Sequence, residues 1–241
     1  MRLINIGCSF SYGNCISEYE TFADKHISPG TLIAEHLGCE EVNLASPGLS
    51  LDGVLRRLHS FNFEKTDKFL IGLPPCTRVQ YVSRIPRDQD KIRHAKSLDV
   101  SEYRNNAFNR GPKIPEDWFK TMKWDQDVKH SKTFDLVETS TYWSYYNILL
   151  IQLTMRHKLN WHNWKERYWL YNSVHGHMQQ TTNIPEVQML RDQIITDNYF
   201  KPDVGLFDMI DSSRYAVAHD DSHPNHKLYY KWAEEFISWM Q

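Results

Sequence analysis

The sequence lacks the features that would place it in a membrane or on a nucleic acid. No apolar run approaches the roughly 20 residues that span a bilayer. The formal net charge is −2 and the predicted isoelectric point is 6.6, so no basic field points to DNA or RNA. An apolar strand pattern begins almost at Met1 and leaves no room for a secretory leader. We therefore expect a cytoplasmic protein without nucleic-acid or membrane partners; its oligomeric state and its incorporation into a larger particle stay open.

Cysteine is also scarce. The four cysteines, Cys8, Cys15, Cys39 and Cys76, form no C-x-x-C pair, and without an export signal we expect reduced thiols. Three of them fall in predicted loops, so a zinc site and a Cys8 nucleophile are alternatives that the spacing disfavours. No metal or other cofactor is expected.

What the sequence does contain starts at its first strand. Leu3, Ile4 and Ile6 form a short apolar run, typical of a strand buried on both faces of a parallel sheet. Gly7 ends the run, and Ser9 follows where the backbone must leave the sheet. Open α/β sheets place their ligand crevice outside the carboxyl ends of the strands. Ser9 is therefore a candidate nucleophile, although an ordinary loop serine fits this segment equally well.

A second polar cluster lies near the end of the chain. His223 follows Asp220 by three residues and precedes a helical pattern over 228–240. Pro224 and Asn225 are residue types that suit the start of a helix. A serine hydroxyl is a weak nucleophile that needs a base. An imidazole held by a carboxylate can take its proton and return it to a leaving group. Ser9, His223 and Asp220 form such a set if the fold brings them together.

Two metal sites are alternatives. A divalent ion could bind the terminal cluster of His219, Asp220, Asp221, His223 and His226, but the motif around Ser9 would then have no role. His175 and His177 could also join a metal site, but no companion ligand pattern accompanies them.

Three motifs together resemble the SGNH (GDSL-type) hydrolase superfamily. Gly7-Cys8-Ser9-Phe10-Ser11-Tyr12-Gly13 resembles its first block, with Cys8 where Asp is commoner. Residues 43–50, Asn-Leu-Ala-Ser-Pro-Gly-Leu-Ser, resemble the second block, whose glycine matches Gly48. Residues 220–225, Asp-Asp-Ser-His-Pro-Asn, resemble the last block. The resemblance covers residues 1 to about 80 and roughly 200 to 241, and it implies a Ser9–His223–Asp220 triad, with the backbone N–H groups of Ser9 and Gly48 holding the oxyanion.

The third block departs from the family pattern. The family often has G-x-N-D after its third strand, and the asparagine helps to hold the oxyanion. Here Gly72 is followed by Leu-Pro-Pro-Cys-Thr-Arg, so Thr77 and Arg78 are the candidate replacements. A surface or salt-bridged arginine is an equal alternative for Arg78. Losing one oxyanion donor costs on the order of 100- to 1,000-fold in turnover, which slows an enzyme without abolishing it.

Alternating patterns predict the architecture. Strands are expected at 3–6, 42–44, 67–73 and 168–171, with 204–207 as a last short strand or the lead into the final motif. Helices are expected at 31–37, 51–63, 139–158 (buried), 184–199 and 228–240. This order predicts one domain over 1–241, a three-layer α/β/α sandwich with a mainly parallel, flavodoxin-like sheet of about five strands. Residues 79–132 break the alternation and are interpreted as an insertion, either a lid over the crevice or a solvated decoration or oligomer contact.

The predicted activity is hydrolysis of an ester. The motifs agree best with a serine-dependent hydrolase. It would remove an acyl group such as acetate from a carbohydrate or other small polar substrate. A non-catalytic binding or structural module on the same fold and an acyltransferase using the same triad are the alternatives.

Overall fold

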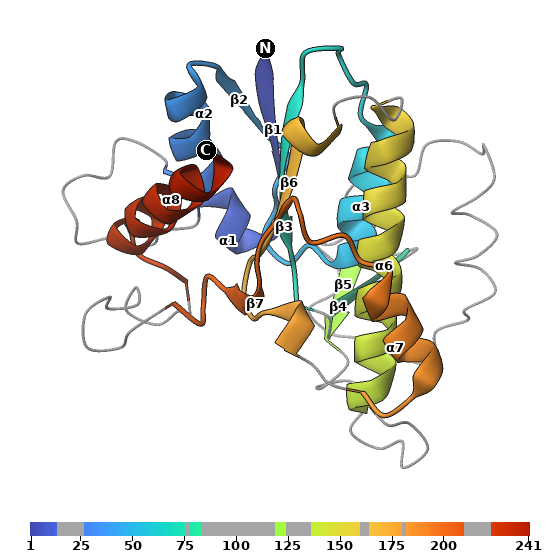
Figure 1. The fold of residues 1–241 in the computed structure, drawn as a ribbon. Coiled ribbons are helices and arrows are strands. Elements are labelled where there is room, and N and C mark those ends of the chain that lie inside the picture. The colour runs from blue at the N-terminus through green and yellow to red at the C-terminus, as the bar shows by residue number, and fades with distance from the viewer. Residues whose placement is uncertain are drawn as a thin grey trace.

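The computed structural model describes residues 1–13, 27–75, 78–82, 119–123, 136–159, 164–179, 182–209 and 223–241. Its centre is a five-stranded sheet in the order β2-β1-β3-β6-β7 (Figure 1). All four strand pairings are parallel. The strands are β1 (Arg2–Ile6), β2 (Glu40–Asn43), β3 (Lys68–Leu73), β6 (Tyr168–Asn172) and β7 (Tyr199–Gly205).

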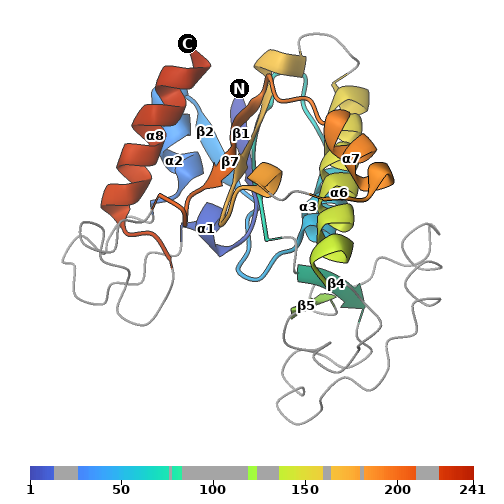
Figure 2. The same cartoon turned by 60° about the horizontal axis from the view of Figure 1, so that its bottom comes forward.

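Helices cover both faces of this sheet (Figures 1 and 2). On one face lie α2 (Pro29–Leu37) and α8 (His226–Met240), which contact each other. On the other face lie α3 (Leu51–Ser60), α6 (Leu136–Lys158) and α7 (Pro185–Asp192). The short helix α1 (Ser9–Tyr12) and the 3-10 helices η3 (Trp164–Glu166) and η4 (His177–Gln179) complete the set. The predicted three-layer α/β/α fold is confirmed.

The core explains the apolar patterns of the sequence. The three central strands are apolar on both faces because both faces are covered by helices, and their side chains are fully buried at Leu3, Ile4, Ile6, Phe69, Leu70, Ile71, Tyr168 and Leu170. Helix α8 buries one face at a spacing of three and four residues, with Leu228, Tyr229, Trp232, Ala233 and Phe236. The rings of Trp232 and Phe236 stack with their centroids 4.8 Å apart.

The helix ends follow capping chemistry. Helix α2 begins with a capping box at Ser28 and ends at Gly38, whose φ of 62° is left-handed. Asn225 caps the start of helix α8: its side chain accepts a hydrogen bond from the Leu228 N–H. This cap fixes where α8 begins, three residues after His223.

The prediction of one helix over 184–199 is wrong. Helix α7 ends at Asp192, and β7 begins at Tyr199. Side chains from neighbouring elements redirect the backbone: the amide of Gln152 bonds both the N–H and the C=O of Ile195. The Asn172 side chain donates to backbone carbonyls of β7, where the register shifts and Lys201 adopts a φ of 43°.

The prediction that α6 is buried holds for only part of its surface. Its inner side packs on the sheet through buried residues such as Tyr145 and Ile148. Tyr142, Tyr146 and Leu153 are 37%, 37% and 48% exposed. Helix α6 contacts α3, α7 and η4, and these three side chains lie on surface that stays partly exposed among the described residues.

Within the predicted insertion, the structure describes an antiparallel pair of strands. These are β4 (Arg78–Val82) and β5 (Phe119–Lys123), with Arg78 opposite Lys123. The sequence pattern missed both strands. The rest of the insertion lies outside the described residues, so its role as a lid and the single-domain boundaries stay predictions.

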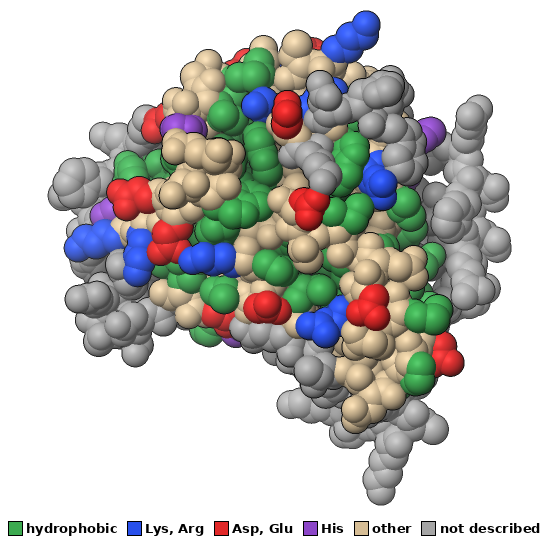
Figure 3. Space-filling model, viewed as in Figure 1, with side chains coloured by type: hydrophobic (Ala, Val, Ile, Leu, Met, Phe, Trp, Pro, Cys, Tyr) green, Lys and Arg blue, Asp and Glu red, His purple; other side chains and the backbone are tan. Residues whose placement is uncertain are grey.

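The charged side chains are mixed on the face drawn in Figure 3. Lysine and arginine lie beside aspartate and glutamate there, with apolar side chains between them. Among the described residues, no helix is both long and apolar enough to cross a membrane.

Candidate active site

The turn after β1 presents Ser9. Gly7 and Cys8 join β1 to α1, and Ser9 is the first residue of this four-residue helix. Gly13 follows the helix with a left-handed φ of 85°. Ser9 is only 5% exposed. A nearly buried hydroxyl needs a hydrogen-bond partner.

That partner is His223, from the other end of the chain. Ser9 Oγ lies 2.6 Å from His223 Nε2, across a separation of 214 positions in the sequence. The imidazole also packs on the Phe10 ring, with the ring centroids 4.9 Å apart. The structure therefore brings two of the three predicted triad residues into hydrogen-bond contact.

Helix α8 sets the position of His223. Its apolar face is buried against the sheet and α2, and the Tyr229 hydroxyl donates to the Phe10 carbonyl at 2.9 Å. Phe10 directly follows Ser9, so this bond joins α8 to the turn that carries the serine. The docking of α8 thus sets the geometry between the hydroxyl and the imidazole.

A buried hydroxyl cluster supports the turn from below. The Tyr171 hydroxyl donates to Ser11 Oγ at 2.7 Å, and Ser11 Oγ lies 3.2 Å from Ser173 Oγ. Burial strongly raises the pKa of Tyr171, which keeps the phenol protonated and able to donate. The cluster connects the loop after β1 to the end of β6.

A second set of bonds holds the turn from the side of β2. The Asn5 amide donates to the Ser11 carbonyl at 2.8 Å and to Glu41 Oε1 at 2.9 Å. Glu41 also accepts from Ser28 Oγ and Thr31 Oγ1, at 2.7 and 2.8 Å. The start of α2 and the end of α1 are therefore fixed by one carboxylate.

The loop with Gly48 lies against the same turn. The Ser46 N–H donates to the Gly7 carbonyl at 2.9 Å, and the Leu44 N–H to the Asn5 carbonyl at 2.7 Å. Gly48 follows with a φ of 78°, which favours glycine. The second motif thus contacts the first.

Other predicted site residues are not described in full. Asp220 and Thr77 lie outside the described residues, as do Asp221, His219, Cys15 and Cys76. For Arg78 the backbone is described, as the first residue of β4. The roles assigned to Asp220, Thr77 and Arg78 stay predictions.

His175 and His177 do not converge on one metal ion. His177 is buried, and its Nε2 donates to the Pro74 carbonyl at 2.9 Å while its Nδ1 accepts from the Ser144 hydroxyl at 2.5 Å. Burial lowers the pKa of His177 to about 4. His175 instead pairs with Asp208. In the part of the chain that the structure describes, no three His, Cys, Asp or Glu residues group as metal ligands.

The thiol of Cys8 is fully buried, whereas the hydroxyl of the neighbouring Ser9 contacts the imidazole. The geometry therefore favours Ser9 over Cys8 as the nucleophile.

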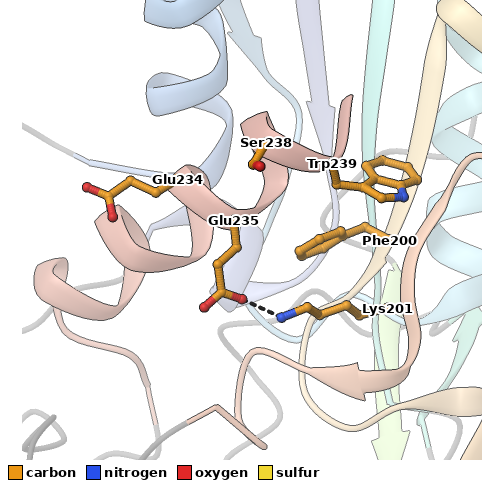
Figure 4. A pocket seen from close by; sticks show the side chains of 6 residues that line it. All are labelled: Phe200, Lys201, Glu234, Glu235, Ser238 and Trp239. Carbon is orange, nitrogen blue, oxygen red and sulfur yellow. Dashed lines mark hydrogen bonds and ion pairs between the residues drawn. The ribbon is translucent and has the colours of Figure 1, made fainter. Parts of the chain in front are cut away.

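A surface hollow between β7 and α8 is a different place. Phe200, Lys201, Glu234, Glu235, Ser238 and Trp239 line it (Figure 4). The ammonium of Lys201 is paired with the Glu235 carboxylate. Trp239 lies at the far end of α8 from His223, about 20 Å along the helix at 1.5 Å per residue. The hollow is therefore separate from the Ser9–His223 pair.

Sequence reasoning missed the residues that support the turn. Ser11 belongs to the first motif, but its partners Tyr171 and Ser173 are 160 and 162 positions away. Asn5, inside an apolar strand, was the one local signal, because a buried amide requires partners.

Comparisons with known proteins place the fold. No family model matches the chain, and no curated protein sequence does. Among solved structures, the lipase Lip_vut3 from a goat rumen metagenome aligns with 99% of this chain and 97% of its own, with a TM-score of 0.52 and 12% identity. At this identity the likeness shows the fold alone.

Two weaker likenesses carry no argument. A structure reported under the words "the active site of a carbohydrate esterase displays divergent catalytic and non-catalytic binding functions" gives a TM-score of 0.47 at 13% identity, over 98% of this chain and 67% of that one. The lipase/acylhydrolase from Enterococcus faecalis gives 0.45 at 12% identity, over 99% and 94%.

Proposed function

We propose that this protein is a serine-dependent ester hydrolase of the SGNH type. The observation that carries the proposal is the 2.6 Å contact between Ser9 Oγ and His223 Nε2. Both residues lie in motifs that resemble the first and last blocks of that superfamily. The whole-chain fold likeness to a lipase supports an activity on ester bonds.

The geometry suits nucleophilic catalysis. His223 Nε2 accepts the hydroxyl proton of Ser9 as Oγ attacks the ester carbonyl, and it then donates this proton to the departing alcohol. Water then attacks the carbonyl of the acyl-serine. His223 Nε2 takes the proton of this water and returns it to Ser9 Oγ as the carboxylic acid leaves. Asp220 is proposed to accept a hydrogen bond from Nδ1 and so to orient the ring.

The oxyanion needs donors close to Ser9. Ser9 is the first residue of α1, and its N–H lies at the start of this helix. The Gly48 loop is held against the same turn by the hydrogen bond from the Ser46 N–H to the Gly7 carbonyl. We assign these two N–H groups to the oxyanion, with Thr77 or Arg78 as a third donor in place of the asparagine of the family.

The proposed substrate is a carbohydrate or other small polar molecule that carries an acyl group such as acetate. The acyl group and the alcohol are not fixed by the pair Ser9–His223, which acts on the carbonyl alone. Product analysis with an added alcohol acceptor separates hydrolysis from acyl transfer.

The test is covalent labelling with a fluorophosphonate probe together with turnover of p-nitrophenyl acetate. We expect both in the wild-type protein and neither in Ser9→Ala, whose circular dichroism spectrum and melting temperature should match the wild type. Ser46→Ala, in the neighbouring loop, is the matched control and should still be labelled. A folded wild-type protein that is neither labelled nor active would instead favour a binding module on this fold.

A further inference from the structure

A second carboxylate–imidazole pair lies at the carboxyl edge of the sheet. His175, in the loop after β6, places Nδ1 2.6 Å from Asp208 Oδ1, in the loop after β7. A carboxylate oxygen only accepts, so Nδ1 carries the hydrogen of this bond. In the neutral ring, Nε2 is then an acceptor, and the His175 side chain is 60% exposed.

The carboxylate of Asp208 is held in place by backbone groups. Its Oδ2 accepts from the N–H of Gly176 at 3.0 Å and of Gly205 at 2.8 Å. A Cβ on Gly176 would lie 2.0 Å from the Asp203 carbonyl carbon, and one on Gly205 would lie 2.0 Å from the Val174 oxygen. Only glycine lets the two loops approach this closely, so the position of Asp208 is set by both loops.

Asp208 joins the two loops through its backbone hydrogen bonds, and these bonds do not involve His175. Oδ2 joins the two loops, while Oδ1 is left for the imidazole. A partly exposed hydrogen-bonded pair of this kind adds little to stability. The pair does fix the imidazole, because Asp208 holds Nδ1 and the ring meets the Phe207 ring edge-on, with centroids 5.0 Å apart. An oriented acceptor beside an aromatic ring is suited to bind a ligand hydroxyl.

The pair belongs to the same edge of the sheet as Ser9. The loops after β1 and β6 are in contact through Ser11 Oγ and Ser173 Oγ, 3.2 Å apart. Strands β1 and β6 flank β3, so their ends are separated by about 10 Å at the usual strand spacing. That span exceeds one ester group, and an extended polyhydroxylated alcohol can bridge it.

We propose that His175, oriented by Asp208, is a subsite that binds a free hydroxyl group on the alcohol half of a carbohydrate ester. The inference rests on the proposed hydrolase function and names the part of the substrate that His175 contacts. His175 Nε2 accepts the hydroxyl hydrogen, and the Phe207 ring offers an apolar surface beside it. His175 takes no part in the proton transfers at Ser9.

The kinetic test compares two substrates, monoacetylated cellobiose with free hydroxyls and p-nitrophenyl acetate without any. In His175→Ala, kcat/KM for the sugar ester should fall on the order of 10-fold more than for p-nitrophenyl acetate, the effect of one lost hydrogen bond. His175→Gln, which keeps an acceptor, should recover part of the difference. His157→Ala, an exposed histidine on α6, is the control and should not change the ratio. Equal losses on both substrates in His175→Ala would overturn the proposal.

A binding test separates this inference from the hydrolase proposal. In the Ser9→Ala protein, titration with cellobiose should shift the imidazole NMR signals of His175, which are assigned by their absence in His175→Ala. The signals of His157 should not move. Shifts at His175 support the subsite even if Ser9 proves inactive. If cellobiose leaves these signals unchanged while the wild type hydrolyses p-nitrophenyl acetate, the subsite is wrong and the hydrolase proposal stands.

Discussion

The hydroxyl of Ser11 fills the space beside Gly72. A Cβ built on Gly72 would lie 2.0 Å from Ser11 Oγ, and the same hydroxyl would lie 2.0 Å from a Cβ on Gly7. The end of β3 and the turn after β1 approach each other closely because neither position carries a side chain. Ser9 lies in that turn, so the glycine of the third motif serves the site even though no asparagine follows it.

Gly72→Ala is therefore expected to damage both stability and activity. The added methyl group also meets Ser173 Oγ and Tyr171 Cζ at 2.7 Å, and overpacking of this kind costs about 1–3 kcal/mol. Gly38→Ala is the control: its φ of 62° disfavours alanine, but no atom lies within 4 Å of the added carbon. Urea unfolding and p-nitrophenyl acetate turnover should show loss of both properties in Gly72→Ala, and loss of stability alone in Gly38→Ala. In the Gly72→Ala background, Ser11→Ala should restore part of the stability, and strict additivity would contradict this explanation.

His223→Gln should lower kcat for p-nitrophenyl acetate by about 100- to 10,000-fold, the range for loss of a general base. Glutamine can still bond Ser9 Oγ, which lies 2.6 Å from the imidazole, but it cannot take up the proton at neutral pH. The matched control is His36→Gln, which changes an exposed histidine of α2 and should leave kcat unchanged. A His223→Gln protein with wild-type turnover would exclude His223 as the base.

The two aspartates before His223 should differ in effect. Asp220→Asn is expected to lower kcat strongly, because an amide no longer orients and stabilises the imidazolium. Asp221→Asn should cost much less activity, since the D-x-x-H spacing leaves Asp221 unassigned. Steady-state kinetics on the two single variants decide between them, and equal losses would reverse the assignment.

His177 should make the folded state sensitive to acid. Burial lowers its pKa to about 4, below the usual 6.5, so the unfolded chain binds this proton at a higher pH than the folded protein. The free energy of unfolding should fall as the pH is lowered from about 6.5 to 4, by about 3 kcal/mol from this group. No further loss from His177 is expected below pH 4. Urea denaturation at several pH values should show a smaller decline for His177→Gln than for the wild type, and parallel curves would contradict the assignment.

Much of the fold could be predicted because its local patterns agree with burial. Apolar spacing and cap residues predict the strand at 3–6, the helix closed by Gly38 and the helix that runs to Met240. Strand β7 was missed at its start because Lys201, Pro202 and Asp203 look like a loop. Their strand conformation depends on hydrogen bonds from the Asn172 amide. The local sequence pattern does not reveal this contact, because Asn172 lies about 30 positions away.

The site was predictable where its chemistry lies in short motifs. Ser9 and His223 each stand beside a recognisable strand end or helix start, and the structure places them in contact. The side chains that hold the turn, Tyr171 and Ser173, come from β6 and the residue after it and meet Ser11 through tertiary packing alone. The His175–Asp208 pair escaped notice for the same reason: two loops 33 positions apart meet only after β6 and β7 pair.

The contact between Ser9 and His223 also has a consequence for synthesis of the protein. The ribosome delivers the imidazole 214 positions after the serine. Domains fold as units once their chain has emerged. A nascent or stalled chain that stops before α8 holds the Ser9 hydroxyl without the His223 imidazole, so the contact between them forms only after α8 has been synthesised and has docked.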